Sequence, residues 1–237
     1  MSTTSTRPAW TTGSALETSY ALARDNFVVF VPAVLILTAP SVIVDVMDFG
    51  WPIGWGLAFI CYSLVQIALA WGALRAMSGY RPDLLSVLRR FGRPAAGSLL
   101  MLCVVQYAAM IATLILVVPA CFLLAIWAVA VPVMLVEGTD MRGAFRRSAE
   151  LTRERRWRVF GVYVLWFLIC GLGFGIVFLL IMKALGAGDQ SLLYKFAAWL
   201  LGSLTATVLY TLPSVLYVLL RQEKEGTTIE QFALKRD

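Results

Sequence analysis

Residues 98–136 read SLLMLCVVQYAAMIATLILVVPACFLLAIWAVAVPVMLV, and the way this uncharged stretch is divided decides the fold. As one helix it would be about 58 Å long, whereas the hydrocarbon core of a bilayer is about 30 Å thick. Two spans, 98–118 and 120–136, fit better, because Pro119 suits the first turn of a new helix, where its missing N–H costs nothing. The second span is short and contains Pro132, so we expect it to be kinked or partly re-entrant.

The whole chain has the composition of a membrane protein. It is 60% hydrophobic and 14% charged, with a mean hydropathy of +0.80, whereas soluble domains are about 45–50% apolar and about 25% charged. The stretches of spanning length lie at about 27–47, 52–74, 98–118, 120–136, 159–182 and 196–220. We therefore expect an all-α polytopic membrane protein. It would have a disordered cytoplasmic N-terminus at 1–13, without a cleavable signal, a single six-span domain at 14–226 and a cytoplasmic tail at 227–237.

Positive charge divides unequally between the two sides that six spans create. One side carries eighteen of the chain's twenty Lys and Arg residues, in segments 1–26, 75–97, 137–158 and 221–237. The other side keeps only Lys183 and Lys195, whereas five spans would separate the two most basic loops. The positive-inside rule therefore predicts six spans with both termini cytoplasmic. It also accounts for the net charge of +6, so we expect no nucleic-acid partner.

Short amphipathic segments precede the odd-numbered spans, which suggests three repeated hairpins, each with an interfacial helix before it. The first, 14–26, starts with a Ser14-x-x-Glu17 capping box and has one apolar face, Leu16, Tyr20, Ala23 and Phe27. The second begins near Asp83. The third begins near Asp140 and carries one apolar stripe, Met141, Ala144, Phe145, Ser148 and Leu151. We expect these helices to lie in the cytoplasmic interface with their apolar faces toward acyl chains.

Arginines on the amphipathic segments are the candidate contacts for anionic lipid headgroups: Arg89, Arg90, Arg142, Arg146, Arg147 and Arg153. A basic residue near an anionic leaflet contributes about 1 kcal/mol. The alternative is that these arginines only anchor the chain and set its topology. Small residues are the candidate helix-packing positions, since they let helices approach closely: Gly171, Gly175 and Gly202. A hinge is the alternative reading of these positions.

Residues for catalysis, metal binding or a cofactor are not evident in the sequence. The chain has no histidine, and its four cysteines lie in apolar stretches, where they act as small hydrophobic side chains. Asp45 and Asp48 would share a face of a helix and could bind a cation, although a solvated helix end is the simpler reading. Lys183 would snorkel or pair with an aspartate. We therefore predict no catalytic residue, no metal and no cofactor.

A family resemblance rests on three neighbouring motifs. These are Val136-Glu137-Gly138, the run from Ala144 to Thr152 (AFRRSAELT) and Arg156-Trp157-Arg158-Val159-Phe160-Gly161. They resemble the membrane-domain family associated with bacterial glycerophosphoryl diester phosphodiesterases, and its YciC-like standalone relatives. The resemblance implies a six-span α-helical inner-membrane protein. It implies no phosphodiesterase activity, because that chemistry needs His and carboxylates around a metal and this chain has no His.

The function expected from these observations is a non-enzymatic one, an envelope- or lipid-related scaffold or interaction role. Its partners would be anionic lipids on the cytoplasmic face and a protein partner or a second copy of the chain. The alternative is a transporter or passive pathway for a small solute or lipid. Gln66 and Gln106 lie inside spans, where they would line such a path or hydrogen-bond between helices. No ionisable residue lies at mid-span, which disfavours a proton-coupled carrier.

Overall fold

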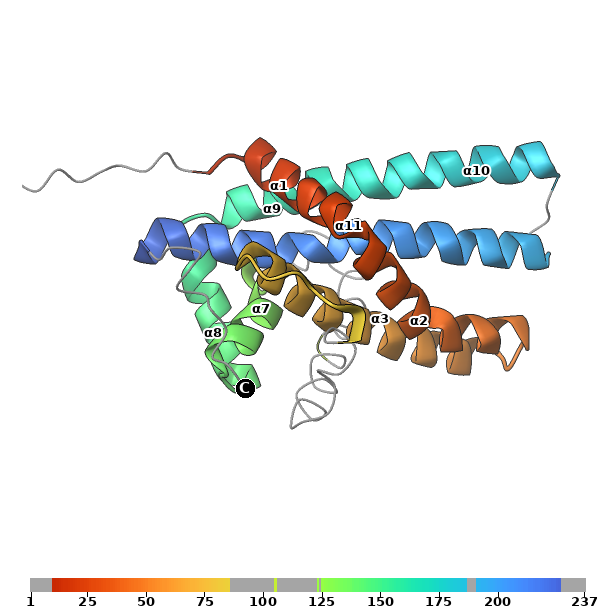
Figure 1. The fold of residues 1–237 in the computed structure, drawn as a ribbon, viewed down its shortest axis with the longest axis horizontal. Helices are drawn as coiled ribbons and strands as arrows, with labels where there is room; N and C mark the ends of the chain where they lie inside the picture. Colours follow the sequence, from red (N-terminus) through yellow and green to blue (C-terminus); the bar gives the residue numbers. More distant parts are fainter. Residues whose placement is uncertain (1–9, 86–104, 106–122, 124, 187–190, 227–237) are drawn as a thin grey trace, which may run out of the picture.

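The computed structural model describes residues 10–85, 105, 123, 125–186 and 191–226. In these residues every regular element is a helix and no strand occurs, which confirms the all-α class. Figure 1 shows α1 (Thr12–Asp25), α2 (Phe27–Val46), α3 (Trp51–Met77), α7 (Ala130–Glu137), α8 (Met141–Thr152), α9 (Arg156–Phe167), the π-helical turn η2 (Leu168–Leu172), α10 (Gly173–Leu185) and α11 (Leu192–Glu225).

Four helical stretches are long and apolar enough to cross a membrane: Phe27–Val46, Pro52–Met77, Arg156–Ala184 and Leu192–Glu225. They coincide with the predicted spans 27–47, 52–74, 159–182 and 196–220. The predicted span 98–118 lies outside the described residues apart from Val105. The count of six spans and the three-hairpin arrangement therefore stay predictions.

The long helices run side by side, and α11 is the central one. It packs against α1, α2 and α3 and also meets α7, α8, α9 and α10. Figure 1 shows the turn between α2 and α3, the end of α10 and the start of α11 at one end of the molecule. The segments that the sequence predicts to be cytoplasmic, such as the α8–α9 turn and the last turns of α11, lie toward the other end.

The 34 residues of α11 make it longer than its predicted span. At 1.5 Å per residue it measures about 51 Å, whereas the hydrocarbon core is about 30 Å thick. Ser191 caps its start by accepting a hydrogen bond from Tyr194 N at 3.1 Å, and Gly226 ends it in the left-handed conformation, with φ of 66°. Its last turns therefore extend beyond the apolar layer and carry charged side chains.

The first helix differs from the expectation at its start and in its buried face. Thr11, rather than Ser14, is the N-cap residue, and the two residues exchange side-chain-to-backbone hydrogen bonds of 3.0 and 3.1 Å. The buried residues are Ala15, Leu16, Ser19 and Ala23, whereas Tyr20 is 55% exposed. These mostly small residues let α1 cross close over α11 and α9. The predicted contact with acyl chains is therefore wrong for Leu16 and Ala23, which face protein.

The predicted kink in the span 120–136 is present in its described part. Regular helical bonding stops at residues 127–129, and α7 starts at Ala130. Pro132 accounts for this break, because it has no N–H to donate to the carbonyl of Ala128 four residues earlier. The hydroxyl of Tyr163, on α9, donates to that carbonyl at 3.3 Å. A side chain from another helix thus replaces the bond that the proline removes.

Candidate functional site

Two of the sequence motifs lie next to each other in the structure. They are the Glu137-Gly138 turn and helix α8, which contains the run from Ala144 to Thr152. Glu137 ends α7, and Gly138 turns the chain with a left-handed φ of 62°. Asp140 then caps α8 by accepting a hydrogen bond from Gly143 N at 3.0 Å. The residues between the two helices therefore suit the geometry of the turn, and this turn sets the direction of α8 relative to α7.

The apolar stripe of α8 packs against protein. Ala144 and Leu151 are 3% exposed and belong to the main hydrophobic core, and Ser148 is fully buried. Phe145 lies against Trp127 with ring centroids 4.9 Å apart. The expectation that this stripe faces acyl chains is therefore wrong for Ala144, Ser148 and Leu151. An amphipathic pattern alone cannot tell a lipid partner from a protein partner.

Arg147 joins α8 to the ends of α7 and α11. Its Nε donates to the two carboxylate oxygens of Glu137 at 3.3 and 3.1 Å, and its Nη2 pairs with Glu225. The Arg147 side chain is 28% exposed, and those of Glu137 and Glu225 are 20% and 24% exposed. Partial burial lowers the pKa of Arg147, but the hydrogen bonds and negative charge of Glu225 and Glu137 outweigh it, and the net pKa is raised.

Tyr217 and Arg221 of α11 extend this network. The Tyr217 hydroxyl donates to Glu137 Oε1 at 3.2 Å and accepts from Arg221 Nη1 at 3.0 Å. Arg221 Nε donates to Glu225 Oε2 at 2.7 Å. We call Glu137, Arg147, Tyr217, Arg221 and Glu225 the motif network. It ties the three helices together through charge-assisted hydrogen bonds, which are stronger than neutral ones.

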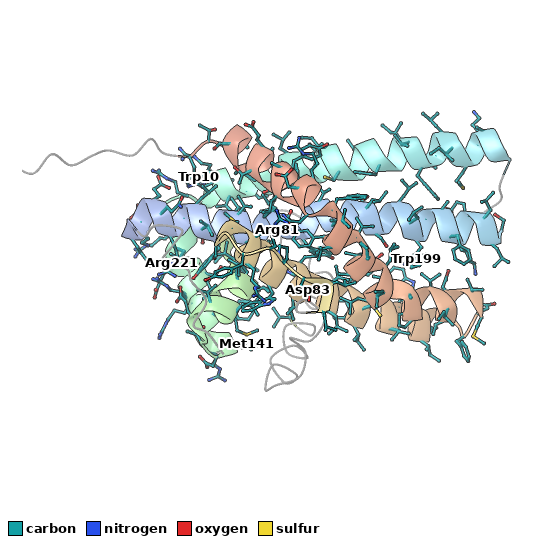
Figure 2. The ribbon with its side chains drawn as sticks, in the orientation of Figure 1. Trp10, Arg81, Asp83, Met141, Trp199 and Arg221 are labelled. Carbon is teal, nitrogen blue, oxygen red and sulfur yellow. The ribbon has the colours of Figure 1, made fainter. Side chains whose placement is uncertain are left out.

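A second cluster joins the N-terminal segment to the same end of α11. The indole Nε1 of Trp10 donates to Glu223 Oε2 at 2.9 Å, and Arg155 donates to Glu223 Oε1 at 2.7 and 3.0 Å. Arg158 Nη1 donates to the Trp10 carbonyl at 3.0 Å, and its guanidinium lies 5.3 Å from the Trp10 ring centroid. Figure 2 shows Trp10 and Arg221 toward the same end of the molecule. The bond to Glu223 raises the pKa of Arg155.

The candidate lipid-contact arginines divide into three groups. Arg142, Arg146 and Arg153 are exposed. Among the described residues, Arg146 has only a loose ion pair with Glu150, at 3.9 Å, and its side chain is 82% exposed. Arg147 instead belongs to the motif network. Arg89 and Arg90 lie outside the described residues.

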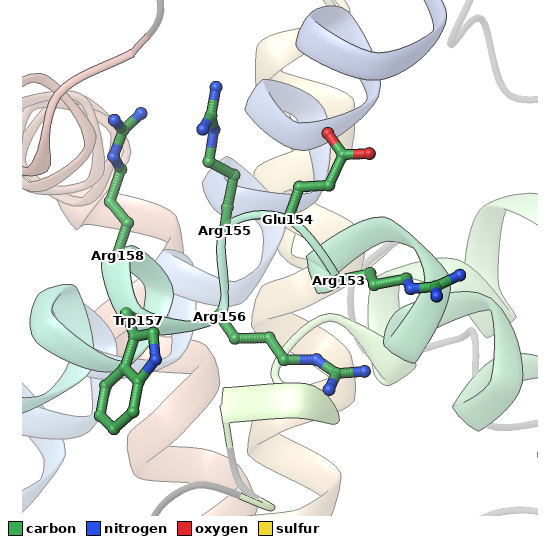
Figure 3. A pocket seen from close by; sticks show the side chains of 6 residues that line it. All are labelled: Arg153, Glu154, Arg155, Arg156, Trp157 and Arg158. Carbon is green, nitrogen blue, oxygen red and sulfur yellow. The ribbon is translucent and has the colours of Figure 1, made fainter.

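The turn between α8 and α9 forms an open pocket of about 420 Å³, lined by Arg153, Glu154, Arg155, Arg156, Trp157 and Arg158. Figure 3 shows Arg155 and Arg158 extending to one side of the turn, and Arg153 and Arg156 to the other. Arg155 and Arg158 are held by Glu223 and Trp10. The Nε of Arg156 is buried, and it has no hydrogen-bond partner among the described residues.

At the opposite end, the aspartate pair expected on one helical face does not form. Helix α2 ends at Val46, and Asp48 has a left-handed φ of 53°, so the two residues do not share a helix. Asp45 meets Lys195, whose Nζ donates to the Asp45 carbonyl at 2.8 Å and lies 3.9 Å from its carboxylate. Within the described residues no group of three or more His, Cys, Asp or Glu side chains is placed to hold a metal.

The candidate packing glycines lie in different surroundings. A Cβ on Gly202 would meet the Tyr62 hydroxyl at 3.6 Å, so α11 approaches α3 there. Gly171 is exposed within the π-helical turn, and a Cβ on Gly175 would meet no atom within 4 Å among the described residues. Close packing at Gly171 and Gly175 therefore stays a prediction, for a neighbour outside the described part of the chain.

Sequence reasoning missed several members of the two clusters. Trp10 was assigned to a disordered N-terminus, yet it is 7% exposed. Glu223 and Glu225 are not among the candidate residues that the sequence indicates. The only sequence signal was the Arg-x-Glu-Lys-Glu run that follows the apolar end of α11, and its spacing alone gives no partner.

A chain whose described elements are all helices, four of them of spanning length, is a multi-pass membrane protein. Residues 102–222 match the family described as the membrane domain of glycerophosphoryl diester phosphodiesterase, and because the match covers half of the chain, the chain belongs to this family. No curated protein and no solved structure matches it. The match does not test the likeness to YciC-like proteins.

Proposed function

We propose that this protein is a non-enzymatic integral protein of the bacterial inner membrane with an envelope- or lipid-related scaffold role. In this proposal six spans form three hairpins, and both termini are cytoplasmic. The basic cytoplasmic end binds anionic lipid and docks a protein partner or a second copy of the chain. Family membership supports the membrane placement, and the basic end supports the interaction role.

One observation carries this proposal. At the end of the molecule formed by α8, the α8–α9 turn and the last turns of α11, which we call the basic end, the carboxylates are paired while several arginines are exposed. Glu137, Glu223 and Glu225 all accept hydrogen bonds from arginines. A carboxylate held in ion pairs is poorly suited to taking a proton from a substrate, since its charged form is already stabilised. Arg142, Arg146 and Arg153 remain exposed, so the outer surface of this end is positive.

The proposal is tested with the full chain in nanodiscs. Discs that contain neutral and anionic lipid of equal chain length are solubilised gently, and the lipid retained by the protein is measured at low and high salt. We expect anionic lipid to be enriched and the enrichment to fall with salt, because exposed charges are screened. Equal retention of both lipids at low salt would contradict the lipid role.

The alternatives are tested with the same preparation. Proteoliposomes loaded with small solutes should show no leak above protein-free vesicles, whereas saturable flux would replace the scaffold role by transport. With divalent metal and a glycerophosphodiester, turnover should remain at background. Metal-dependent turnover lost on Asp45→Asn would make Asp45 part of an active site.

A further inference from the structure

We propose that the pocket at the α8–α9 turn is a binding site for the phosphate of an anionic phospholipid. Two of its arginines, Arg153 and Arg156, supply the headgroup contacts. This inference rests on the proposed function and assigns it to one place. It also adds Arg156 to the contacts that the sequence indicates.

Two of the four arginines at this turn bond to other parts of the protein, and the other two can bind a ligand. Arg155 is occupied by Glu223, and Arg158 by the carbonyl and ring of Trp10. For Arg153 and Arg156 the described residues offer no ion-pair partner, and both line the pocket. Figure 3 shows the Glu154 side chain extending in a different direction from those of Arg153 and Arg156. Two guanidinium groups on one side of a turn match the oxygens of a phosphate, which arginine binds in a bidentate manner.

Arg156 supplies the second observation. Its Nε is buried and lacks an acceptor within the described part of the chain. A buried donor without a partner costs about 1–3 kcal/mol, so such groups in folded proteins usually have a reason, such as an ion that binds there. A phosphate oxygen would satisfy this donor once the Arg156 side chain turns so that its Nε reaches the pocket surface.

The backbone at this turn favours the same ligand. Helix α9 begins at Arg156, no side chain caps its first turn, and no acidic residue lies there. The free N–H groups at a helix start carry partial positive charge and attract anions. They add to the guanidinium groups that line the pocket.

The position of the turn and the surface of α9 favour a lipid as the source of the phosphate. The apolar stretch Arg156–Ala184 starts at the pocket, which places the arginines at headgroup level. Below it, one face of α9 and η2 exposes Trp157, Val164, Leu165 and Leu168, with exposed fractions of 74, 40, 42 and 44%. Spacings of seven, eight and eleven residues keep these side chains on one side of a helix. An acyl chain can lie along them while its phosphate occupies the pocket.

The test uses the full chain in neutral nanodiscs that contain a small fraction of phosphatidylglycerol, with native mass spectrometry to count bound lipid. The site variant is Arg153→Gln/Arg156→Gln. The matched control is Arg142→Gln/Arg146→Gln, which removes the same charge from the exposed face of α8. At about 1 kcal/mol for each basic residue, the site variant should bind phosphatidylglycerol roughly 30-fold more weakly. The control removes the same charge from the outer surface but no contact with a phosphate in the pocket, so it should weaken binding several-fold less than the site variant.

Each other outcome has a separate meaning. Equal losses in both variants would overturn the pocket and leave a diffuse basic surface, so the proposed function would survive. Unchanged binding in the site variant, with wild-type preference intact, would also overturn the pocket alone. No preference for phosphatidylglycerol over phosphatidylcholine in the wild type would overturn both.

A separate arm adds inorganic phosphate. Displacement of the lipid at low millimolar concentration would show a soluble-phosphate site and overturn the lipid assignment, whereas retention of the lipid supports it. Thermal unfolding of both variants shows whether they fold like the wild type.

Discussion

Ser148 donates a hydrogen bond of 2.8 Å to the carbonyl oxygen of Ile126, twenty-two residues earlier in the chain. The same hydroxyl lies 3.4 Å from the backbone N of Val129, from which it accepts a hydrogen bond. Ile126 directly precedes the interrupted turn before α7, and Val129 is the last residue of that turn. One serine of the motif therefore satisfies two backbone groups that the break exposes. This explains why a small hydroxyl side chain is needed at a fully buried position of α8.

Ser148→Ala should destabilise the protein. It leaves Ile126 O with only a weak 3.4 Å contact to Thr152 and leaves Val129 N without its side-chain acceptor. A buried group that loses its partner costs about 1–3 kcal/mol, and each kcal/mol lowers Tm by about 2–4 °C in a chain of this size. Thermal unfolding in detergent or nanodiscs measures the change. Thr205→Ala is the control, because within the described part of the chain that hydroxyl bonds only the carbonyl of Leu201 on its own helix. Equal Tm values for the two variants would argue against the role of Ser148.

Arg147→Lys should also destabilise the protein, although it keeps the charge. A lysine ammonium lacks the planar fork with which Arg147 reaches Glu137 and Glu225 together. We expect a loss of about 1–3 kcal/mol in unfolding free energy, since one partly buried carboxylate loses its bond from Arg147 and keeps only the one from Tyr217 or Arg221. Arg146→Lys is the matched control on the neighbouring, exposed position and should change little. If Arg147→Lys unfolds like the wild type, the motif network does not hold the helices together.

Trp10→Phe should release the start of the chain. Phenylalanine keeps an aromatic ring for Arg158 but cannot donate to Glu223. Hydrogen–deuterium exchange should rise in the first turns of α1, while exchange in α8 stays unchanged. Tyr20→Phe, on the exposed side of α1, is the control and should alter neither region. Unchanged exchange at the start of α1 would show that the Trp10–Glu223 contact does not anchor it.

Topology fusions test the orientation. A reporter that is active only in the periplasm should give activity when fused after Gly50 or Gly186. It should give none when fused after Glu154 or Glu225. The expectation follows from the excess of Lys and Arg on the second set of segments, which the positive-inside rule keeps in the cytoplasm. The reverse pattern would require both termini to be periplasmic.

The sequence by itself determined the class of protein and the positions of four described spans. Long apolar stretches have only one way to satisfy their backbone in a bilayer with local bonds, and that is the α-helix. Pro132 likewise predicted a break in its span, because the missing N–H is a property of the residue and not of its surroundings. The Asp140 start of α8 followed from the chemistry of a cap, which is equally local.

Only the tertiary structure shows whether a given side chain contacts lipid, solvent or another helix. The stripe of α8 has the same pattern whether it meets lipid or protein, and only the position of α7 and α11 settled that Leu151 is buried in the core. Arg147 and Arg146 are adjacent and chemically identical, yet one reaches Glu225, seventy-eight residues away, and the other points outward. Such differences come from long-range packing, because a contact across many residues depends on where whole helices lie, and no local spacing encodes it.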